Sequence, residues 1–283
     1  MQVFVIGSNG YIGKSAVETF RASNLNVKAV SSHPTLDMLY LDLSMPNNFS
    51  YAHINAGDVV LVTAAISAPD VCANEQERAW AVNVTGTSGF ISKVMERGGY
   101  VIFFSSDTVY GERDNEFDEQ ASCRPAGEYA EMKHEVEKRF FGNPLFKSIR
   151  LSYVFSSEDK FTKYLVGCVE RDEEAEIFHP FYRAVIHRDD VVQGALALAQ
   201  RWDEFPQRAI NFGGPVVLAR TEFAKILHDT ALPNLRFRVT QPDADFFRNR
   251  PRVIRMESPV LAALLGRLSH TLGEAVMIES NSI

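Results

Sequence analysis

The 283-residue chain contains only three cysteines, and their spacing suits neither disulfides nor a metal. Cys72, Cys123 and Cys168 are odd in number and form no CxxC pair, which argues against a disulfide framework and against a zinc site. The seven histidines are scattered, and no two of them lie four residues apart. We therefore expect no metal site.

Long apolar runs and excess positive charge are also missing. No apolar run reaches the ~18 residues that a membrane helix needs. The net charge of −7 argues against a nucleic-acid binder, which would carry a basic stripe. The first residues run directly into a strand pattern, with no signal peptide before it. We expect a soluble cytoplasmic protein with no nucleic-acid or membrane partner, although a local arginine pocket can still bind an anionic substrate.

Apolar segments and helical segments alternate along the first half of the chain. Short runs rich in β-branched and aromatic residues are typical of buried parallel strands, and the segments between them have helical periodicity. This alternation predicts an α/β fold, a Rossmann-type doubly wound parallel sheet. The expected strands are 2–6, 26–30, 39–41, 58–62, 100–104 and 148–155, and the expected helices are 14–21, 75–96 and 129–141.

The pattern becomes weaker after about residue 156. We expect a dinucleotide-binding Rossmann domain over residues 1–156 and a smaller substrate-binding lobe over residues 157–283, from which the chain returns in part to the first domain. The elements expected in this half are a strand and turn at 209–215 and helices at 189–200, 221–230 and 260–268.

A glycine-rich turn joins the first expected strand to the first helix. Residues 7–13 read G-S-N-G-Y-I-G, a G-x-x-G-x-x-G spacing. Gly7 permits the tight turn, Gly10 lets the backbone approach a pyrophosphate, and Gly13 allows close helix packing. The helix N-terminus then offers free N–H groups to the phosphates. The turn predicts a dinucleotide site, although three glycines also suit a plain strand-to-helix turn.

The end of the second expected strand bears on the choice of cofactor. An acidic residue there would hold the ribose hydroxyls of NAD, but this chain has Ser31, Ser32 and His33. These side chains do not repel a 2′-phosphate, so NADP(H) is preferred while NAD(H) stays possible. Asp42, after the third strand, is suited to accept a hydrogen bond from the adenine amino group, and equally suited to a cap or a solvated turn.

Small residues follow the fourth expected strand, and an Asn and a Gly lie inside the helix expected after it. Ala64 and Ala65 leave room for a ligand at the carboxyl edge of the sheet, where open α/β sheets bind ligands. Asn83 and Gly86 lie inside the expected helix 75–96, where both cost stability. We expect them to serve a buried side-chain hydrogen bond and a close packing contact, and not catalysis.

The stretch from the fifth strand to the next helix carries the candidate catalytic groups. Ser105 and Ser106 end the strand at the same sheet edge as the glycine turn. Tyr129 and Lys133 are four residues apart, so they share one face of a helix. A hydroxyl, a phenol and an ammonium in this arrangement suit proton transfer to or from a carbonyl oxygen. Each motif alone is common, and only their co-occurrence with the glycine turn favours catalysis.

These motifs occur in the order and at the spacing of one known family. Together they resemble the extended short-chain dehydrogenase/reductase family, the epimerase and dehydratase class that modifies nucleotide sugars. The resemblance covers about residues 1–270, and within the family the chain is most similar to the dTDP-4-dehydrorhamnose reductase branch. The motifs are the glycine turn, Ala64-Ala65, N-V-x-G-T at 83–87, S-S-x-x-V-Y-G at 105–111, Tyr129-x-x-x-Lys133, R-x-x-I-H at 183–187 and N-x-G-G-P at 211–215.

The resemblance implies a role for each candidate residue. Tyr129 would protonate the carbonyl oxygen as hydride arrives, Lys133 would lower the pKa of the phenol and hold the nicotinamide ribose, and Ser106 would fix the carbonyl oxygen. The cofactor-binding residues would be Gly7, Ser8, Asn9, Gly10, Tyr11, Ile12, Gly13, Ser31, Ser32, His33, Asp42, Leu43, Ala64, Ala65, Tyr129, Lys133 and Val154.

The expected substrate-binding residues are Ser67, Ser106, Asp107 and Arg183. Asp107 either orients the substrate or simply ends the strand. Arg183 either pairs with the substrate diphosphate, which a guanidinium matches well, or forms a surface ion pair with a residue such as Asp189.

The residues after Ser106 bear on the type of reaction. Sugar-nucleotide 4,6-dehydratases carry Thr-Asp-Glu where this chain has Ser106-Asp107-Thr108, so the acid for water elimination is missing. The resemblance therefore implies an NAD(P)H-dependent reductase of a keto-sugar nucleotide. An NAD-dependent nucleotide-sugar epimerase stays an alternative, as does a non-catalytic NADP-binding regulatory subunit. A homodimer, paired through the helices that carry the Tyr-Lys and N-V-x-G motifs, is a further expectation.

Overall fold

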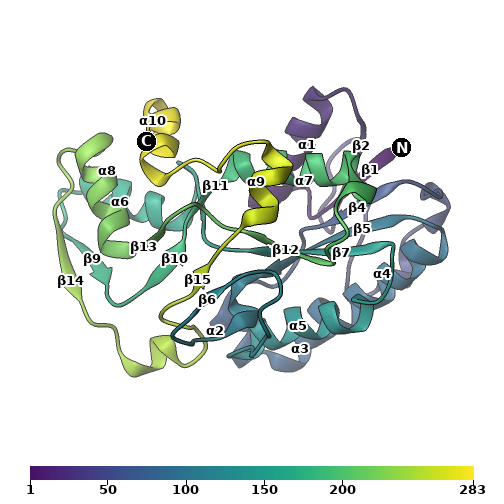
Figure 1. Ribbon diagram of the computed structural model, residues 1–283, viewed down its shortest axis with the longest axis horizontal. Helices are drawn as coiled ribbons and strands as arrows, with labels where there is room; N and C mark the ends of the chain where they lie inside the picture. Colours follow the sequence, from purple (N-terminus) through teal and green to yellow (C-terminus); the bar gives the residue numbers. More distant parts are fainter.

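A seven-stranded parallel sheet forms the centre of the molecule (Figure 1). The computed structural model describes residues 1–283 apart from the side chain of Ala244. This sheet confirms the expected doubly wound α/β fold. In spatial order its strands are β12 (Ala209–Phe212), β7 (Phe146–Leu151), β5 (Tyr100–Ser106), β4 (Val59–Val62), β1 (Gln2–Ile6), β2 (Asn26–Ser31) and β3 (Leu39–Tyr40).

Alternate residues of each strand face two separate hydrophobic cores, because successive side chains of a strand point to opposite sides. Val3 and Val5 contribute to one core, and Phe4 and Ile6 to the other. The first core includes residues of α1 (Tyr11–Ala22), α7 (Arg188–Gln200) and α9 (Pro259–Leu265). The second includes residues of α4 (Thr87–Glu96) and α5 (Glu128–Phe140). Figure 1 shows these two helix layers above and below the sheet.

A smaller group of elements packs at one end of the sheet, on the left in Figure 1. Its core is formed mainly by phenylalanine, leucine and alanine side chains. The elements are α6 (Lys160–Glu170), α8 (Arg220–Thr230), α10 (Leu272–Glu279) and the strand pairs β9 (Ala175–Phe178) with β14 (Phe237–Thr240) and β10 (Tyr182–Ala184) with β13 (Val217–Ala219).

Two short strand pairs lie where the two parts of the chain meet. The pair β8 (Val154–Phe155) with β11 (Ile186–His187) follows the end of β7, and the pair β6 (Glu116–Phe117) with β15 (Arg255–Met256) joins the loop after β5 to the C-terminal region. Both pairs are parallel. The later part of the chain also returns to the central sheet, since β12 pairs with β7 and α7 and α9 cover one sheet face.

The expected helix 75–96 is divided into three parts. α2 (Pro69–Asn74) precedes α3 (Gln76–Trp80), a wide π-helical turn over Ala81–Gly86, and then α4. The side chain of Asn83 bonds the N–H and the carbonyl oxygen of Ile66, both at 2.9 Å. A Cβ on Gly86 would lie 1.6 Å from the Leu43 carbonyl oxygen. Both residues therefore have the structural roles that the sequence predicts.

Two other expectations were wrong in detail. The expected strand 148–155 ends at Leu151, and the chain leaves the sheet before β8 pairs with β11. The expected helix 260–268 ends at Leu265, because Gly266 has a φ of +67° and closes it. A further helix, α10, follows and was missed, although Thr271 and Glu274 form a capping box at its start.

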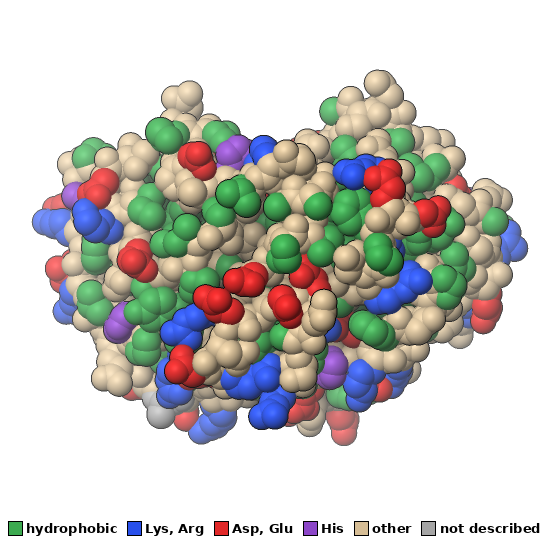
Figure 2. Space-filling view, in the orientation of Figure 1, with side chains coloured by type: hydrophobic (Ala, Val, Ile, Leu, Met, Phe, Trp, Pro, Cys, Tyr) green, Lys and Arg blue, Asp and Glu red, His purple; other side chains and the backbone are tan. Residues whose placement is uncertain are grey.

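Charged side chains of both signs are intermingled on the face shown in Figure 2. Among the described residues, no helix has the length and apolar character that a membrane crossing requires.

Candidate active site

The glycine turn between β1 and α1 is packed too closely for larger residues. Gly7 has a φ of +88°, and a Cβ on it would lie 2.8 Å from the Ala64 nitrogen. A Cβ on Gly13 would lie 2.1 Å from the Gly7 carbonyl oxygen. α1 begins after Gly10 without a side-chain cap, so its first N–H groups face outward. This backbone cradle fits the phosphates of a dinucleotide.

A cavity of about 960 Å³ extends from this cradle along the carboxyl edge of the sheet. It brings together most of the residues that the sequence predicts for cofactor binding. These are Gly7, Asn9, Gly10, Tyr11, Ile12, Gly13, Ser31, Ser32, His33, Asp42, Leu43, Ala64, Ala65, Tyr129 and Lys133, together with the expected substrate residue Ser67.

Several lining residues were not anticipated. Thr63 and Leu151 stand at strand ends, so strand topology alone would have placed them at this edge beside Ser105, which was expected there. Arg78 also lines the cavity and pairs with Glu75 at 2.5 Å. No sequence motif marks Arg78.

Two expected cofactor residues lie away from the lining. Ser8 is buried, and its hydroxyl donates to the Val30 carbonyl oxygen at 3.1 Å. Val154 belongs to β8, whose partner is β11.

The end of the cavity beside β2 is organised by Asn9. Its Nδ2 donates to the Ser31 Oγ at 3.0 Å and to the His33 carbonyl oxygen at 2.8 Å. This fixes the loop after β2 and leaves Ser32 and His33 exposed at the cavity wall. Asp42 accepts two hydrogen bonds from Ser44 through Oδ1, both at 2.8 Å, which is the turn arrangement that the sequence also allowed.

Tyr129 and Lys133 share the face of α5 that meets the cavity. The Lys133 Nζ donates to the Phe104 carbonyl oxygen at 2.7 Å and lies 5.7 Å from the centre of the Tyr129 ring. Burial lowers the pKa of Lys133 to about 8. Burial, reinforced by Cys72 and Asp107, raises the pKa of Tyr129 above its ordinary value. The pKa of the phenol is therefore raised where a lowered value was expected, and burial is the largest cause.

Ser106 ends β5 and caps the short 3₁₀ turn Asp107–Tyr110. Its Oγ accepts from the Thr108 N–H at 3.2 Å and from the Thr108 Oγ1 at 2.9 Å, and donates to the Asp107 Oδ1 at 3.3 Å. The hydroxyl is buried, and the cap fixes its position.

Arg183 and Asp107 form a buried pair. The Arg183 Nη1 donates to the carbonyl oxygens of Tyr182 and Arg252, at 2.6 and 3.2 Å, and its Nη2 donates to that of Pro251 at 2.7 Å. Its Nε lies 3.6 Å from the Asp107 Oδ2. The expectation of a surface pair with a residue such as Asp189 was wrong, since the guanidinium is enclosed by backbone from residues 251–252.

Two other arginines lie near each other in the second half of the chain, Arg220 at the start of α8 and Arg250 in the segment before β15. The Arg220 guanidinium lies 4.6 Å from the Phe161 ring and 4.5 Å from the Phe181 ring, and no carboxylate of the described residues is within 4.0 Å of it. Burial lowers the pKa of Arg220, and the charge of Arg250 adds to this effect. Arg250 forms a two-point ion pair with Asp70, at 2.8 and 2.5 Å.

Comparison with known proteins places these features in one family. Residues 1–258 match the family described as the RmlD substrate binding domain. The chain is 22% identical over 275 residues to methionine adenosyltransferase 2 subunit beta of Pongo abelii, a match that covers 93% of this chain and 82% of that protein. It is 29% identical over 174 residues to a probable low-salt glycan biosynthesis reductase, Agl14, of Haloferax volcanii, covering 59% of this chain and 58% of that protein.

Solved structures share the fold over the whole chain. A dTDP-4-dehydrorhamnose reductase, RfbD ortholog, of Clostridium acetobutylicum superposes with a TM-score of 0.82 at 19% identity, covering 99% of each chain. UDP-glucuronic acid 4-epimerase of Bacillus cereus, in complex with UDP-glucuronic acid and NAD, gives a TM-score of 0.80 at 17% identity, covering 100% of this chain and 98% of that chain. At these identities the likeness concerns the fold.

Proposed function

Because this chain belongs to the RmlD substrate binding domain family, we propose that it is an NAD(P)H-dependent reductase of a keto-sugar nucleotide. The observation that carries the proposal is the cavity of about 960 Å³, which joins the glycine cradle to Tyr129 and Lys133. Hydride transfer to a carbonyl needs a dinucleotide site and a proton donor, and this cavity has residues suited to both.

The cofactor, when bound, supplies the hydride that adds to the carbonyl carbon. Tyr129 donates a proton to the carbonyl oxygen, and its raised pKa keeps the phenol protonated at neutral pH. Lys133, whose Nζ now donates to the Phe104 carbonyl oxygen, has further donors for ribose hydroxyls. Ser106 positions the carbonyl oxygen after its 3.3 Å contact with Asp107 is released.

The substrate diphosphate is assigned to Arg220 and Arg250, in place of the expected Arg183. Arg220 has no carboxylate partner among the described residues, and a diphosphate would supply the missing charge. Arg250 is near enough to lower the pKa of Arg220, so the two cations act on one region. Arg183 has both Nη atoms bonded to backbone oxygens and serves to hold Asp107.

NADP(H) is the preferred cofactor in this proposal. No carboxylate follows β2 at the cavity wall, and Ser32 and His33 are the exposed groups there. A 2′-phosphate would meet a hydroxyl and an imidazole instead of the acidic residue that holds the NAD ribose. NAD(H) stays compatible with the same loop.

The test is NADPH oxidation in the presence of dTDP-4-keto-6-deoxyglucose and related 4-keto-sugar nucleotides. Steady consumption of NADPH with one of these substrates supports the proposal, and no turnover with any of them would overturn it. An epimerase would recycle a tightly held NAD, so it would change the sugar without net NADPH consumption.

A non-catalytic cofactor-binding subunit is the second candidate function. It is favoured by the relatives named methionine adenosyltransferase 2 subunit beta, which match along 93% of this chain. The presence of Tyr129, Lys133 and Ser106 argues for catalysis instead. Binding of NADPH without turnover, together with co-purification of an enzyme, would favour the subunit over the reductase.

A further inference from the structure

We infer that His187, Asp190 and His270 bind a divalent transition-metal ion. Each side chain offers one ligand atom, and these atoms all lie within 4.8 Å of one another. Two imidazoles and a carboxylate are a ligand set suited to Zn²⁺, Co²⁺ or Ni²⁺. No sequence motif indicates this site, because β11 and α7 carry two of the ligands and the segment before α10 carries the third.

His187 is prepared as a ligand by its surroundings. The side chain is buried, with a relative exposure of 2% for the residue, and its Nε2 lies 3.1 Å from the Glu279 Oε1. Metal-binding histidines usually donate one ring N–H to a carboxylate in this way, which leaves the other nitrogen as the ligand. The His187 Nδ1 is buried and has no hydrogen-bond partner among the described residues. A bound ion would satisfy this otherwise costly group.

The charge around Asp190 also allows a cation. Asp190 is fully buried and accepts from the His270 N–H at 2.7 Å, from the His270 Nδ1 at 3.0 Å and from Arg267 at 2.6 Å. Arg267 is 44% exposed, so its guanidinium can move into water when an ion replaces it.

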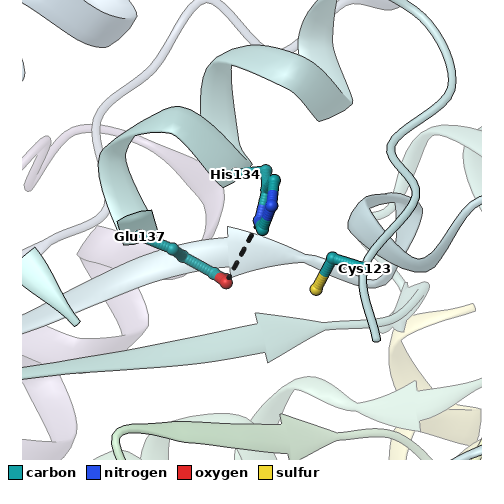
Figure 3. Close-up of side chains that lie close together, drawn as sticks. All are labelled: Cys123, His134 and Glu137. Atoms are coloured by element: carbon teal, nitrogen blue, oxygen red, sulfur yellow. Dashed lines mark ion pairs between the residues drawn. The ribbon is translucent and has the colours of Figure 1, made fainter. Parts of the chain in front are cut away.

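A second candidate cluster does not meet these conditions. Cys123, His134 and Glu137 also lie within 4.8 Å of one another, with His134 and Glu137 on α5 and Cys123 in the preceding loop (Figure 3). The Glu137 carboxylate is bonded by Arg150 through Nη2 at 2.7 Å and Nε at 3.2 Å. The Arg150 side chain is only 5% exposed and cannot move into water. A divalent ion there would be repelled by a fixed cation.

The inferred ion would connect the C-terminal segment, which carries His270, to the part of the chain that contains the glycine turn. Glu279, on α10, also accepts from the Ser157 N–H at 2.8 Å. The neighbouring Ser156 Oγ accepts from the Tyr11 hydroxyl of the glycine turn at 2.8 Å. A metal at His187 and His270 would therefore stabilise the segment that packs behind the cofactor loop, without taking part in the reaction.

The experiment uses the full chain, stripped of metal with a chelator and titrated with Zn²⁺ and Co²⁺ by calorimetry and thermal unfolding. We expect one ion per chain and a raised unfolding temperature. His270→Gln, at a partly exposed ligand, should weaken binding by more than about tenfold. Arg267→Gln should instead tighten binding, because it removes the competing cation. His134→Gln, in the other cluster, should bind as the parent does.

Bound Co²⁺ should show no thiolate charge-transfer absorption, since no cysteine belongs to the site. The inference is overturned if the parent chain binds no stoichiometric ion. It is equally overturned if binding survives in His270→Gln, is lost in His134→Gln, or fails to tighten in Arg267→Gln. Arg267 is not a proposed metal ligand, so the Arg267→Gln result does not require a variant that lacks a ligand to fold. None of these measurements depends on the reductase activity.

Discussion

Burial shifts the pKa values of Tyr129 and Lys133 in the directions that favour the uncharged form of each side chain. The pKa of the phenol is raised and that of the ammonium is lowered to about 8. A protonated phenol is the form required to donate a proton during reduction. The sequence predicts which two residues pair on the helix, but it could not predict these shifts, because they depend on how deeply the fold encloses both side chains.

Replacing the phenol tests its role as proton donor. Tyr129→Phe should bind NADPH with an unchanged Kd and lose turnover by about 10²- to 10⁴-fold, since only the proton is removed. Tyr100→Phe is the matched control, because Tyr100 packs against Trp202 in the first core. Stopped-flow and steady-state kinetics provide the measurement, and full activity in Tyr129→Phe would exclude this residue as the acid.

The Lys133 pKa predicts a pH dependence of cofactor binding. The ammonium form is present below about pH 8 and is lost as the pH rises through that value, so NADPH affinity should fall above it. The measurement is the Kd of NADPH from pH 6 to 10 by fluorescence titration. Lys133→Met should bind weakly with no such dependence. A parent Kd that is constant over the whole range would contradict the assignment.

The loop after β2 provides a test of cofactor preference. Ser32→Asp places a carboxylate at the cavity wall, where it should repel a 2′-phosphate and accept from a ribose hydroxyl. The ratio of kcat/KM for NADPH to that for NADH should therefore fall below the parent value. Ser32→Asn, similar in size and uncharged, should keep the parent ratio. An unchanged ratio of kcat/KM values in Ser32→Asp would show that the 2′ position of the adenosine ribose does not lie next to Ser32.

At the scale of single elements, the interrupted helix between α3 and α4 is set by contacts on both sides. Asn83 bonds the backbone of Ile66, and Gly86 lies against the Leu43 carbonyl oxygen. An Asn and a Gly inside a helical pattern are visible in the sequence and predict that some tertiary contact exists. The wide turn between them could not be predicted, because it results from where the Leu43 loop passes.

A pair of glycine substitutions on this helix tests the packing argument. Gly86→Ala should lower the free energy of unfolding by about 1–3 kcal/mol, because its Cβ would lie 1.6 Å from a backbone oxygen. Gly89→Ala is the control, since its nearest atom is the Pro46 Cγ at 3.7 Å, and the change should raise stability by up to ~1 kcal/mol. Urea denaturation measures both, and equal effects would contradict the account.

At the scale of the whole molecule, the first half of the chain was more predictable than the second. Its strands are local apolar runs, and parallel topology brings their ends to one edge. The surroundings of Arg183 depend instead on backbone from residues 251–252, nearly 70 positions further along the chain. Arg220 and Arg250, and likewise His187 and His270, are also brought near each other only by the folded chain. Contacts between residues so far apart in the sequence cannot be predicted from periodicity or from motifs.

The assignment of the diphosphate to the second lobe has its own test. Arg220→Gln should raise the KM for the nucleotide sugar by roughly 10- to 100-fold, the cost of losing hydrogen bonds to a charged group. The Kd of NADPH should not change. Arg236→Gln, which removes a surface pair with Asp172, is the control. An unchanged KM in Arg220→Gln would show that other residues bind the diphosphate.

The most direct test of the proposed reaction follows the hydride itself. The protein would be incubated with a 4-keto-sugar nucleotide and NADPH deuterated at the nicotinamide C4, and the products analysed by mass spectrometry. We predict that the sugar gains the deuterium at the former carbonyl carbon, with an equal amount of oxidised cofactor. An altered sugar without the label, or labelled NADPH recovered unchanged with every keto-sugar nucleotide tried, would contradict the account.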